Sequence, residues 1–364
     1  MLNFILWDQD PVLFRLGGFE ARWYGLFFAM AFVIGQLIIA RIFKAEGKTE
    51  KQVESLTLYM IIATVVGARL GHCLFYEPDY YLANPIEILK VWKGGLASHG
   101  ATIGIILAMY LWARKEKTTW LWILDRIVIV VALGGAFIRL GNLMNSEIVG
   151  KPTDSPIAFV FAHAGREAIE ASAPQAVKSL HFEKDPKAEG VFLNGGGAPR
   201  VHVLAKLEAP GADPMVLQGY AERQLPAALM SYDEAHEHFR PEDAPLNPKL
   251  ANGTLEVDLA AVPRHAAQLY EALSCIVLFL LLYTTWSRRK GSLPDGRLFG
   301  AFVVVLFTLR FAYEFLKENQ VAFEDTMTFN LGQSLSIPLV LIGLYILSRS
   351  YRKNMHTRSG DAIS

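Results

Sequence analysis

Cysteine is scarce in this chain, and so is charge. Only two cysteines occur among 364 residues, Cys73 and Cys275, and both lie in apolar segments. Two such residues give neither a disulfide framework nor the spacing of a metal site, so we interpret them as small buried hydrophobic side chains. Charged residues make up 19% of the chain and the net charge is zero, which leaves no overall attraction for nucleic acid.

The amino terminus lacks the basic region of a cleaved signal peptide and instead carries Asp8 and Asp10 before the first apolar stretch. We therefore expect the first membrane helix to act as its own insertion signal. No internal repeat and no low-complexity tract is found.

Long apolar runs dominate the remainder, and 52% of the residues are hydrophobic. A helix that crosses a bilayer needs roughly 20 mostly apolar residues. The sequence predicts an all-α polytopic membrane protein with seven spans: Trp23–Ala40, Leu56–Tyr76, His99–Trp112, Trp120–Leu140, Ala267–Trp286, Leu298–Leu316 and Gln333–Leu347.

Lysine and arginine divide unequally between the two sets of short loops. One set carries fifteen: Arg41, Lys44, Lys48, Lys51, Arg114, Lys115, Lys117, Arg288, Arg289, Lys290, Arg297, Arg349, Arg352, Lys353 and Arg358. The other set carries four: Arg15, Arg22, Lys90 and Lys93. Because basic loops stay in the cytoplasm, the N-terminus is predicted outside and the C-terminus inside.

A polar segment separates the fourth span from the fifth. Period-two alternation at 158–161, 201–204 and 254–259, between glycine and proline clusters, predicts short strands, and 221–239 has a helical pattern. We therefore predict three parts: residues 1–150 as a membrane body, 151–263 as a β-rich extracytoplasmic domain, and 264–364 as the rest of the membrane body with a cytoplasmic tail.

Ionisable residues gather in the outer half of the predicted membrane body. They are Arg69, His72, His99, Arg139, Arg264, His265, Arg310 and Glu314. A charge in hydrocarbon is costly, so such residues predict a functional site. The arginine fork suits phosphate, and the amides Asn142, Asn145 and Gln268 add donors. Close approach of the backbone is allowed by the glycines Gly94, Gly95, Gly100 and Gly141. The pattern predicts a pocket for an anionic, membrane-borne substrate.

Several alternatives remain open from these residues alone. Arg310 and Glu314 could form a structural ion pair, and the pocket would equally suit an enzyme, a lipid scramblase or an anion carrier. A non-enzymatic phospholipid or anion transporter is less favoured, because no repeat is seen and the charges lie off the midplane. Asp125 and Arg126, near the cytoplasmic end of their span, are interpreted as a snorkelling structural pair. His236 and His238 lack a third ligand nearby, so no metal is expected.

Several motifs, in order along the whole chain, resemble the bacterial prolipoprotein diacylglyceryl transferase family. They are Arg22–Leu26 (RWYGL), Arg69–Gly71 (RLG), Gly94–Gly100 (GGLASHG), Arg139–Glu147 (RLGNLMNSE) with Gly150, Pro263–His265 (PRH) with Gln268–Glu271 (QLYE), Arg310 with Glu314–Phe315, and Gly332–Pro338 (GQSLSIP). The block that begins Arg-Leu-Gly-Asn is the most specific. The departures are Ala101 and Ala266, where the family usually has glycine and proline, and Ala164 to Gly253, which looks inserted.

The resemblance implies seven helices, an outward N-terminus and an active site toward the outer leaflet of the bacterial cytoplasmic (inner) membrane. It implies transfer of the diacylglyceryl group of phosphatidylglycerol to the lipobox cysteine of a preprolipoprotein, with glycerol 1-phosphate as leaving group. The implied partners are these two substrates and membrane lipid, with no metal or other cofactor.

The reaction suggests roles for individual residues. Arg139 and Arg310 are predicted to stabilise the charge of the departing phosphate. His99 is predicted either to accept the thiol proton, since histidine titrates near neutral pH, or to hydrogen-bond the headgroup. The predicted substrate-binding residues are Tyr24, Arg69, Gly100, Asn142, Asn145, Glu147, Gly150, Arg264, Gln268, Tyr270 and Glu314.

Overall fold

The structure is a computed structural model that describes residues 4–90, 95, 97–185, 192–193, 199–318 and 327–360. The chain forms two compact units. The first, here called the sheet unit, comprises Met1–Phe27, Ile138–Ala272 and Ala312–Asn330. The second, the helical unit, comprises Phe28–Phe137, Leu273–Phe311 and Leu331–Ser364. The predicted domain boundaries at 150/151 and 263/264 stay a prediction.

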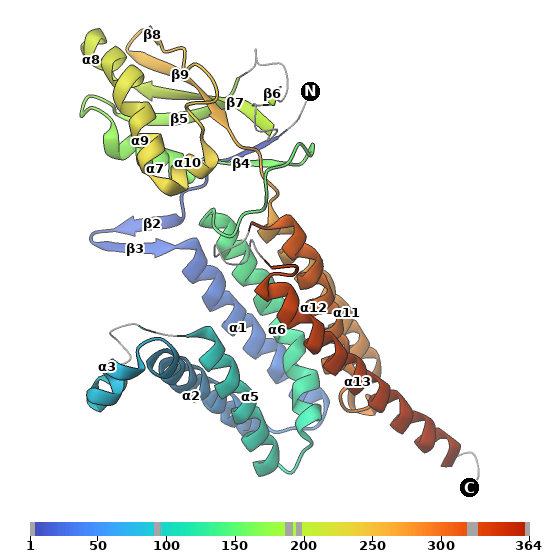
Figure 1. Cartoon of the computed structure of the whole chain (residues 1–364). Helices are drawn as coiled ribbons and strands as arrows, with labels where there is room; N and C mark the ends of the chain where they lie inside the picture. Colours follow the sequence, from blue (N-terminus) through green and yellow to red (C-terminus); the bar gives the residue numbers. More distant parts are fainter. Residues whose placement is uncertain are drawn as a thin grey trace. The chain divides into compact units, whose positions relative to one another are not determined.

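Long helices build the helical unit (Figure 1). They are α1 (Trp23–Ala45), α2 (Glu50–Phe75), α5 (Ser98–Lys115), α6 (Trp120–Met144), α11 (Ala267–Arg289), α12 (Arg297–Tyr313) and α13 (Leu331–Gly360), with the short α3 (Pro78–Ala83) and α4 (Pro85–Ile88). One end of each of α1, α6, α11 and α12 is counted with the sheet unit.

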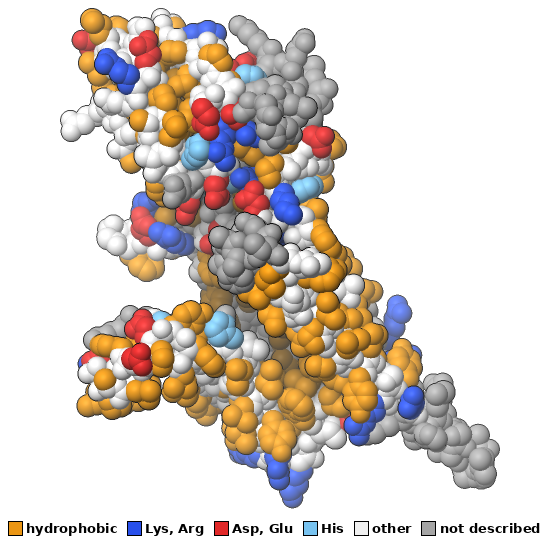
Figure 2. Space-filling view, in the orientation of Figure 1, with side chains coloured by type: hydrophobic (Ala, Val, Ile, Leu, Met, Phe, Trp, Pro, Cys, Tyr) orange, Lys and Arg blue, Asp and Glu red, His pale blue; other side chains and the backbone are white. Residues whose placement is uncertain are grey.

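Within the described residues, six helices are long and apolar enough to cross a membrane: α1, α2, α6, α11, α12 and α13. Six of the seven predicted spans are thereby confirmed as apolar helices. The remaining one, predicted at 99–112, does form the helix α5, which has 18 residues and is not among the six. Figure 2 shows hydrophobic side chains over the surface of the long helices. Leu37, Ile61 and Leu341 are among the exposed apolar residues of these helices.

Asp125 and Arg126 are both fully buried, so the prediction that they snorkel to water is wrong. The Asp125 carboxylate accepts hydrogen bonds from the backbone N–H groups of Gly296 and Phe299, each at 2.8 Å, and so satisfies the otherwise unpaired start of α12. Arg126 pairs with Glu46 at 2.8 Å. Buried charges need such partners, and here the partners come from other helices.

The helices α2 and α5 approach each other through small residues. A Cβ atom added to Gly67 would lie 2.5 Å from the carbonyl oxygen of Gly100, and one added to Gly71 would lie 2.6 Å from the Gly100 Cα. Small residues of this kind let membrane helices pack backbone to backbone. At Gly100, which is also predicted to admit a ligand, the missing side chain admits the neighbouring helix.

The sheet unit contains three groups of strands. The strand β1 (Ile5–Trp7) pairs in parallel with β4 (Phe159–Phe161), and β2 (Val12–Leu16) forms a hairpin with β3 (Phe19–Arg22). An antiparallel sheet has the order β5 (Ser179–Lys184), β7 (Pro199–Glu208), β9 (Thr254–Ala261), β8 (Lys249–Ala251), and β6 (Phe192–Leu193) also pairs with β7. The strands predicted from alternation at 158–161, 201–204 and 254–259 are thus confirmed.

The polar segment also contains helices: α7 (His163–Ser172), α8 (Pro214–Gly219), α9 (Leu225–Ser231) and α10 (Asp233–His238), with a π-helical turn at Tyr220–Gln224. They share a buried apolar core with the sheet, which includes Leu207, Leu217, Tyr220, Leu229 and Leu259. The segment therefore combines a small antiparallel sheet with helices.

Candidate active site

Arg139 lies near the end of α6, in the part that belongs to the sheet unit. Its Nε contacts a carboxylate oxygen of Glu271 on α11, and its Nη1 donates to Oδ1 of Asn142 at 3.4 Å. Asn142 follows three residues later, a spacing that places both side chains on one helix face. The Arg139 side chain is 24% exposed, so the guanidinium is held by two partners and is still accessible.

The chain turns sharply where α6 ends. Ser146 and Ile148 have positive φ angles of 56° and 59°, which is uncommon for residues other than glycine and a genuine outlier for β-branched Ile148. The turn brings the Glu147 carboxylate back to α6, where it accepts from Nδ2 of Asn142 at 2.7 Å and of Asn145 at 3.2 Å. Unusual backbone of this kind is often found at functional sites.

Three further predicted residues pack around this turn. The fully buried Gln268 donates to the carbonyl oxygen of Glu147 at 2.6 Å. Tyr24 packs against the turn of α6 that holds Gly141, where an added Cβ would lie 2.7 Å from the Tyr24 ring. At Gly150 an added Cβ would lie 2.6 Å from the Cβ of His265. The glycines are explained by close packing with neighbouring protein.

The sequence prediction assigned no role to Glu271 or Lys317. Glu271 is 8% exposed, and its second carboxylate oxygen contacts Nζ of Lys317, which is 7% exposed. Glu314 lies 4.0 Å from the same Nζ and accepts from Nδ2 of Asn330 at 3.1 Å. Glu271 stands in the quoted QLYE motif, and Lys317 follows Glu314 by three residues. The motif was the sequence signal for Glu271, and the spacing was the signal for Lys317.

Arg264 is buried and donates to three groups of the sheet unit. They are the carbonyl oxygens of Gly150, at 3.3 Å, and Glu237, at 2.8 Å, and the carboxylate of Glu318, at 2.7 Å. Burial, with a smaller effect of the Arg264 charge, lowers the pKa of His238 to about 3. Arg264 therefore joins the polar segment to the chain around Gly150.

Tyr270 lies on the first turns of α11, and its hydroxyl group is 3.4 Å from Nδ1 of His265. Burial lowers the pKa of His265 from its usual value, against a smaller opposing effect of Asp154. The His265 ring is thus biased toward its neutral form.

In the helical unit, His99 begins α5 and is exposed. Its Nε2 lies 3.3 Å from the Tyr76 hydroxyl, and the two rings stack with centroids 5.8 Å apart. His72 stacks on Tyr76 as well, at 5.5 Å. Tyr76 therefore contacts both predicted histidines.

Arg69 donates hydrogen bonds to backbone carbonyl oxygens. Its Nε donates to the carbonyl oxygen of Ile88 at 2.9 Å, and its Nη2 donates to that of Glu87 at 2.6 Å. The guanidinium also lies over the Tyr81 ring, 4.9 Å from its centroid. The geometry makes Arg69 an anchor for the segment after α2.

Arg310 lies exposed in the last turn of α12, in the helical unit. Two residues of the Gly94–Gly100 motif, Gly94 and Leu96, lie outside the described residues. The predicted site residues are thus divided between the units. The sheet unit holds Tyr24, Arg139, Asn142, Asn145, Glu147, Gly150, Arg264, Gln268, Tyr270 and Glu314, and the helical unit holds Arg69, His99, Gly100 and Arg310.

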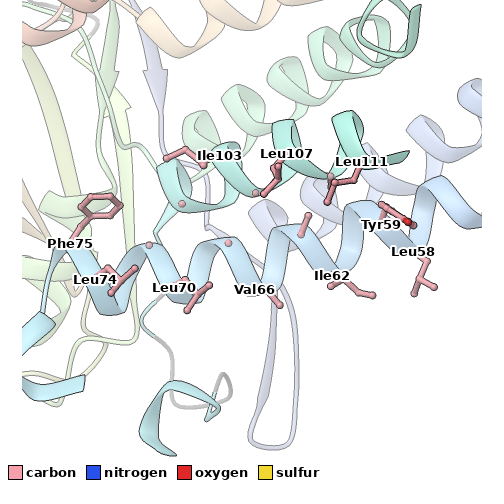
Figure 3. Close-up of a pocket in the computed structure, with 16 residues that line it drawn as sticks. Leu58, Tyr59, Ile62, Val66, Leu70, Leu74, Phe75, Ile103, Leu107 and Leu111 are labelled. Atoms are coloured by element: carbon pink, nitrogen blue, oxygen red, sulfur yellow. The ribbon is translucent and has the colours of Figure 1, made fainter. Parts of the chain in front are cut away.

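A groove of about 700 Å³ runs along α2 and α5 (Figure 3). Its lining is almost wholly apolar and comes from both helices, with Leu70 on α2 and Ile103 and Leu107 on α5. Its lining reaches Phe75, whose ring contacts that of His99 edge-on at 6.2 Å. The groove therefore ends beside the predicted His99 site.

A second hollow, of about 640 Å³, lies in the sheet unit, beside the β2–β3 hairpin. It has a mixed lining of Leu13, Phe14, Phe19, Glu20, Ala21, Arg22, Tyr24, Gly25, Leu26 and Asn145. Two of these, Tyr24 and Asn145, are predicted site residues. This hairpin pocket is therefore continuous with the cluster around Asn142 and Glu147.

Comparison with known proteins agrees with these motifs. The family profile described as prolipoprotein diacylglyceryl transferase matches residues 11–349. A phosphatidylglycerol–prolipoprotein diacylglyceryl transferase of Chloroherpeton thalassium is 34% identical over 355 residues, which is 96% of each chain. The enzymes of that name from Tolumonas auensis and Porphyromonas gingivalis are 34% and 33% identical over 96% of this chain and 98% and 95% of their own. The chain therefore belongs to the prolipoprotein diacylglyceryl transferase family.

Proposed function

We propose that the residues around Arg139 bind the phosphate of phosphatidylglycerol while its diacylglyceryl group passes to the cysteine of a prolipoprotein. The protein is a diacylglyceryl transferase, since the family profile covers nearly its full length. The donor and acceptor are the substrates that the names of its relatives give, phosphatidylglycerol and a prolipoprotein. The roles of individual residues are the proposal.

The reaction is a displacement at a primary glycerol carbon. A new bond forms between the cysteine sulfur and this carbon, and the bond from the carbon to the phosphate oxygen breaks. The electron pair of the broken bond leaves with glycerol 1-phosphate, and the thiol proton passes to a base. The nucleophile is the thiolate. Positive groups directed at the departing oxygen lower the barrier, because negative charge develops there.

Arg139 is the residue best placed for this task. Its Nε and Nη1 are engaged by Glu271 and Asn142. The Arg139 side chain is nevertheless 24% exposed, so part of the guanidinium stays accessible. A guanidinium fixed on one side and accessible on the other is suited to a phosphate oxygen. This geometry is the observation that carries the proposal.

His99 serves as the base for the thiol proton or as a hydrogen-bond partner of the headgroup. Its exposed ring, stacked on Tyr76, has a fixed orientation suited to either role. Arg310 acts as a second cation for the phosphate. Asn142, Asn145, Glu147 and Tyr24 shape the headgroup site, whereas Arg264, Gln268 and Gly150 hold the surrounding backbone in place.

The groove along α2 and α5 accommodates hydrocarbon of the donor lipid. A nearly wholly apolar lining suits acyl chains, and its volume is within the range of ligand pockets, roughly 300–1,000 Å³. The hairpin pocket accommodates the acceptor. Its apolar side chains suit those of the lipobox, and Arg22, Glu20 and Asn145 offer polar partners for an extended peptide.

The protein spans the bacterial inner membrane seven times, with its N-terminus outside, its C-terminus inside and its active site toward the outer leaflet. The bias of lysine and arginine toward one set of loops supports this orientation. In this arrangement α5 is the additional span, buried in part against α2.

Replacement of Arg139 tests the proposal. Arg139→Ala is expected to lower the transfer of labelled diacylglyceryl to a cysteine-containing lipobox peptide by roughly a hundredfold or more, as when an oxyanion donor is removed. Arg166→Ala is the matched control, since Arg166 is another partly exposed arginine of the sheet unit, with a side chain 23% exposed, and it pairs with Asp8 and Glu170 away from both hollows. Transfer at a near-normal rate by correctly inserted Arg139→Ala protein would remove Arg139 from this role.

A further inference from the structure

Lys317 is a buried cation in the sheet unit, and the reaction as described above does not use it. It is 7% exposed, and its ammonium lies between the carboxylates of Glu271, which it contacts, and Glu314, at 4.0 Å. Lysine is almost never fully buried unless it is paired. A lysine in this position either stabilises the fold or acts on the residues of the cluster. The contacts of Glu271 favour the second possibility.

Glu271 bridges Lys317 and Arg139. One of its carboxylate oxygens contacts Nε of Arg139, and the other contacts Nζ of Lys317. A carboxylate held at both oxygens cannot rotate without breaking one contact. The position of the Arg139 guanidinium is therefore mechanically linked to the presence of the Lys317 ammonium.

The backbone of Lys317 is fixed as well. It forms an isolated β-bridge with Gly150, and the N–H of Lys151 donates to the carbonyl oxygen of Leu316 at 2.7 Å. A Cβ added to Gly150 would lie 2.8 Å from that same Leu316 oxygen. Gly150, predicted as a substrate-binding residue, thus permits the close contact that directs Lys317 toward Glu271.

Counting charges shows what the lysine contributes. Arg139 and Lys317 carry two positive charges, and Glu271 and Glu314 carry two negative charges, so the four groups together are neutral. Without Lys317 the group would carry a net negative charge beside the place proposed for an anionic leaving group. Such a charge opposes the departure of phosphate, and in a poorly solvated site the effect is strong.

We propose that Lys317 is a positioning residue for the transfer reaction. Its contact with Glu271 fixes the carboxylate that orients Arg139. Its positive charge also balances that of the carboxylate, so the positive charge of Arg139 remains available to the phosphate. The inference rests on the role proposed for Arg139. Lys317 does not touch the substrate, and its effect reaches the reaction through Glu271.

The test compares Lys317→Met, Lys317→Arg, Glu271→Gln and the double variant Lys317→Met/Glu271→Gln in the full-length membrane protein. Lys317→Met is expected to lower kcat about tenfold while KM for the lipobox peptide stays the same, and Lys317→Arg is expected to restore most of the rate. In the Glu271→Gln background, Lys317→Met should cause little further loss, because the carboxylate through which it acts is gone.

Arg200→Met provides the control for loss of a buried cation. Arg200 is 8% exposed on β7 and pairs with Asp243, and its removal should leave kcat unchanged. Amounts of inserted protein and thermal unfolding are measured for every variant. A normal kcat for Lys317→Met, or losses that multiply fully in the double variant, would overturn the inference. If Arg139→Ala also transfers normally, the proposed function fails with it; if Arg139→Ala is inactive, only the role of Lys317 fails.

Discussion

Arg69 and Arg139 are both predicted in the outer half of the membrane body, but they have different surroundings. Arg69 donates to the carbonyl oxygens of Glu87 and Ile88 and lies on the Tyr81 ring, which leaves it suited to holding backbone. Arg139 contacts one carboxylate and one amide and stays partly exposed. Arginine has five donors, so its function depends on which of them the protein itself already occupies.

The two candidate roles of His99 predict different results for His99→Gln. Glutamine can still donate and accept hydrogen bonds, but it cannot carry a proton away from a thiol. If His99 is the base, kcat should fall by roughly a hundredfold, which is typical for loss of a general base. If His99 binds the headgroup, kcat should change little for His99→Gln, and KM for phosphatidylglycerol should rise for His99→Ala, which removes the hydrogen bond.

The measurement is a steady-state assay in which donor and acceptor concentrations are varied separately. Tyr76→Phe is the companion variant, since it removes the hydroxyl group 3.3 Å from Nε2 of His99 and keeps the stacked ring. An unchanged kcat for His99→Gln would exclude the base, and an unchanged KM for phosphatidylglycerol in His99→Ala would exclude the headgroup role.

At the residue scale the sequence predicts contacts between residues close in the chain better than contacts between distant ones. Arg139, Asn142, Asn145 and Glu147 lie within nine residues of one another, and the structure brings them together through a single helix end. Arg126 with Glu46, or Lys317 with Glu271, are pairs far apart in sequence. Periodicity carries no information on such contacts, because they depend on how separate helices pack.

Among the elements, the long apolar helices were the most predictable, since roughly 20 apolar residues in a row specify a span with little help from context. α5 was harder. It is 18 residues long and ends in Arg114 and Lys115, and glycine contacts with α2 rather than an apolar run define its place. The β2–β3 hairpin was not predicted, although Phe19–Arg22 alternates apolar and polar residues, because strands of five and four residues directly before α1 are too short for a clear pattern.

The hairpin pocket and the groove should bind different substrates, and one experiment can separate them. Phe19→Ala removes an apolar wall of the hairpin pocket and is expected to raise KM for the lipobox peptide about tenfold, the effect of losing one buried aromatic contact. Ile103→Asn places a polar group in the groove and is expected to raise KM for phosphatidylglycerol. Each variant should leave the other KM unchanged.

Matched controls come from residues of the same kind outside the two hollows. Leu16 is 74% exposed on the same hairpin, and Leu341 is 62% exposed on α13; neither lines the pocket or the groove. Leu16→Ala and Leu341→Asn should therefore keep both KM values. Equal changes in both KM values for Phe19→Ala would argue against a separate acceptor site.

For the whole molecule, the polar segment between α6 and α11 is the least predictable part. Its strands followed from alternation, but its link to the candidate site did not. Arg264, just before α11, donates to the carbonyl oxygen of Glu237 within this segment and to that of Gly150. β9, at the end of this segment, depends on the stretch from Ala164 to Gly253, since it pairs with β7 along its whole length. We infer that the segment helps to hold the chain around Gly150.

Deleting Ala164 to Gly253 tests this inference. The deletion removes the Glu237 carbonyl that pairs with Arg264 and the strand that pairs with β9, so transfer per inserted molecule should fall about tenfold or more, the effect of losing a charged hydrogen bond. Arg264→Gln in the full-length chain should give a loss of similar size, and it measures the same contact if the shortened chain does not insert. Full transfer by the shortened enzyme would instead make the segment accessory, and the search for its role would move to a binding partner outside the membrane.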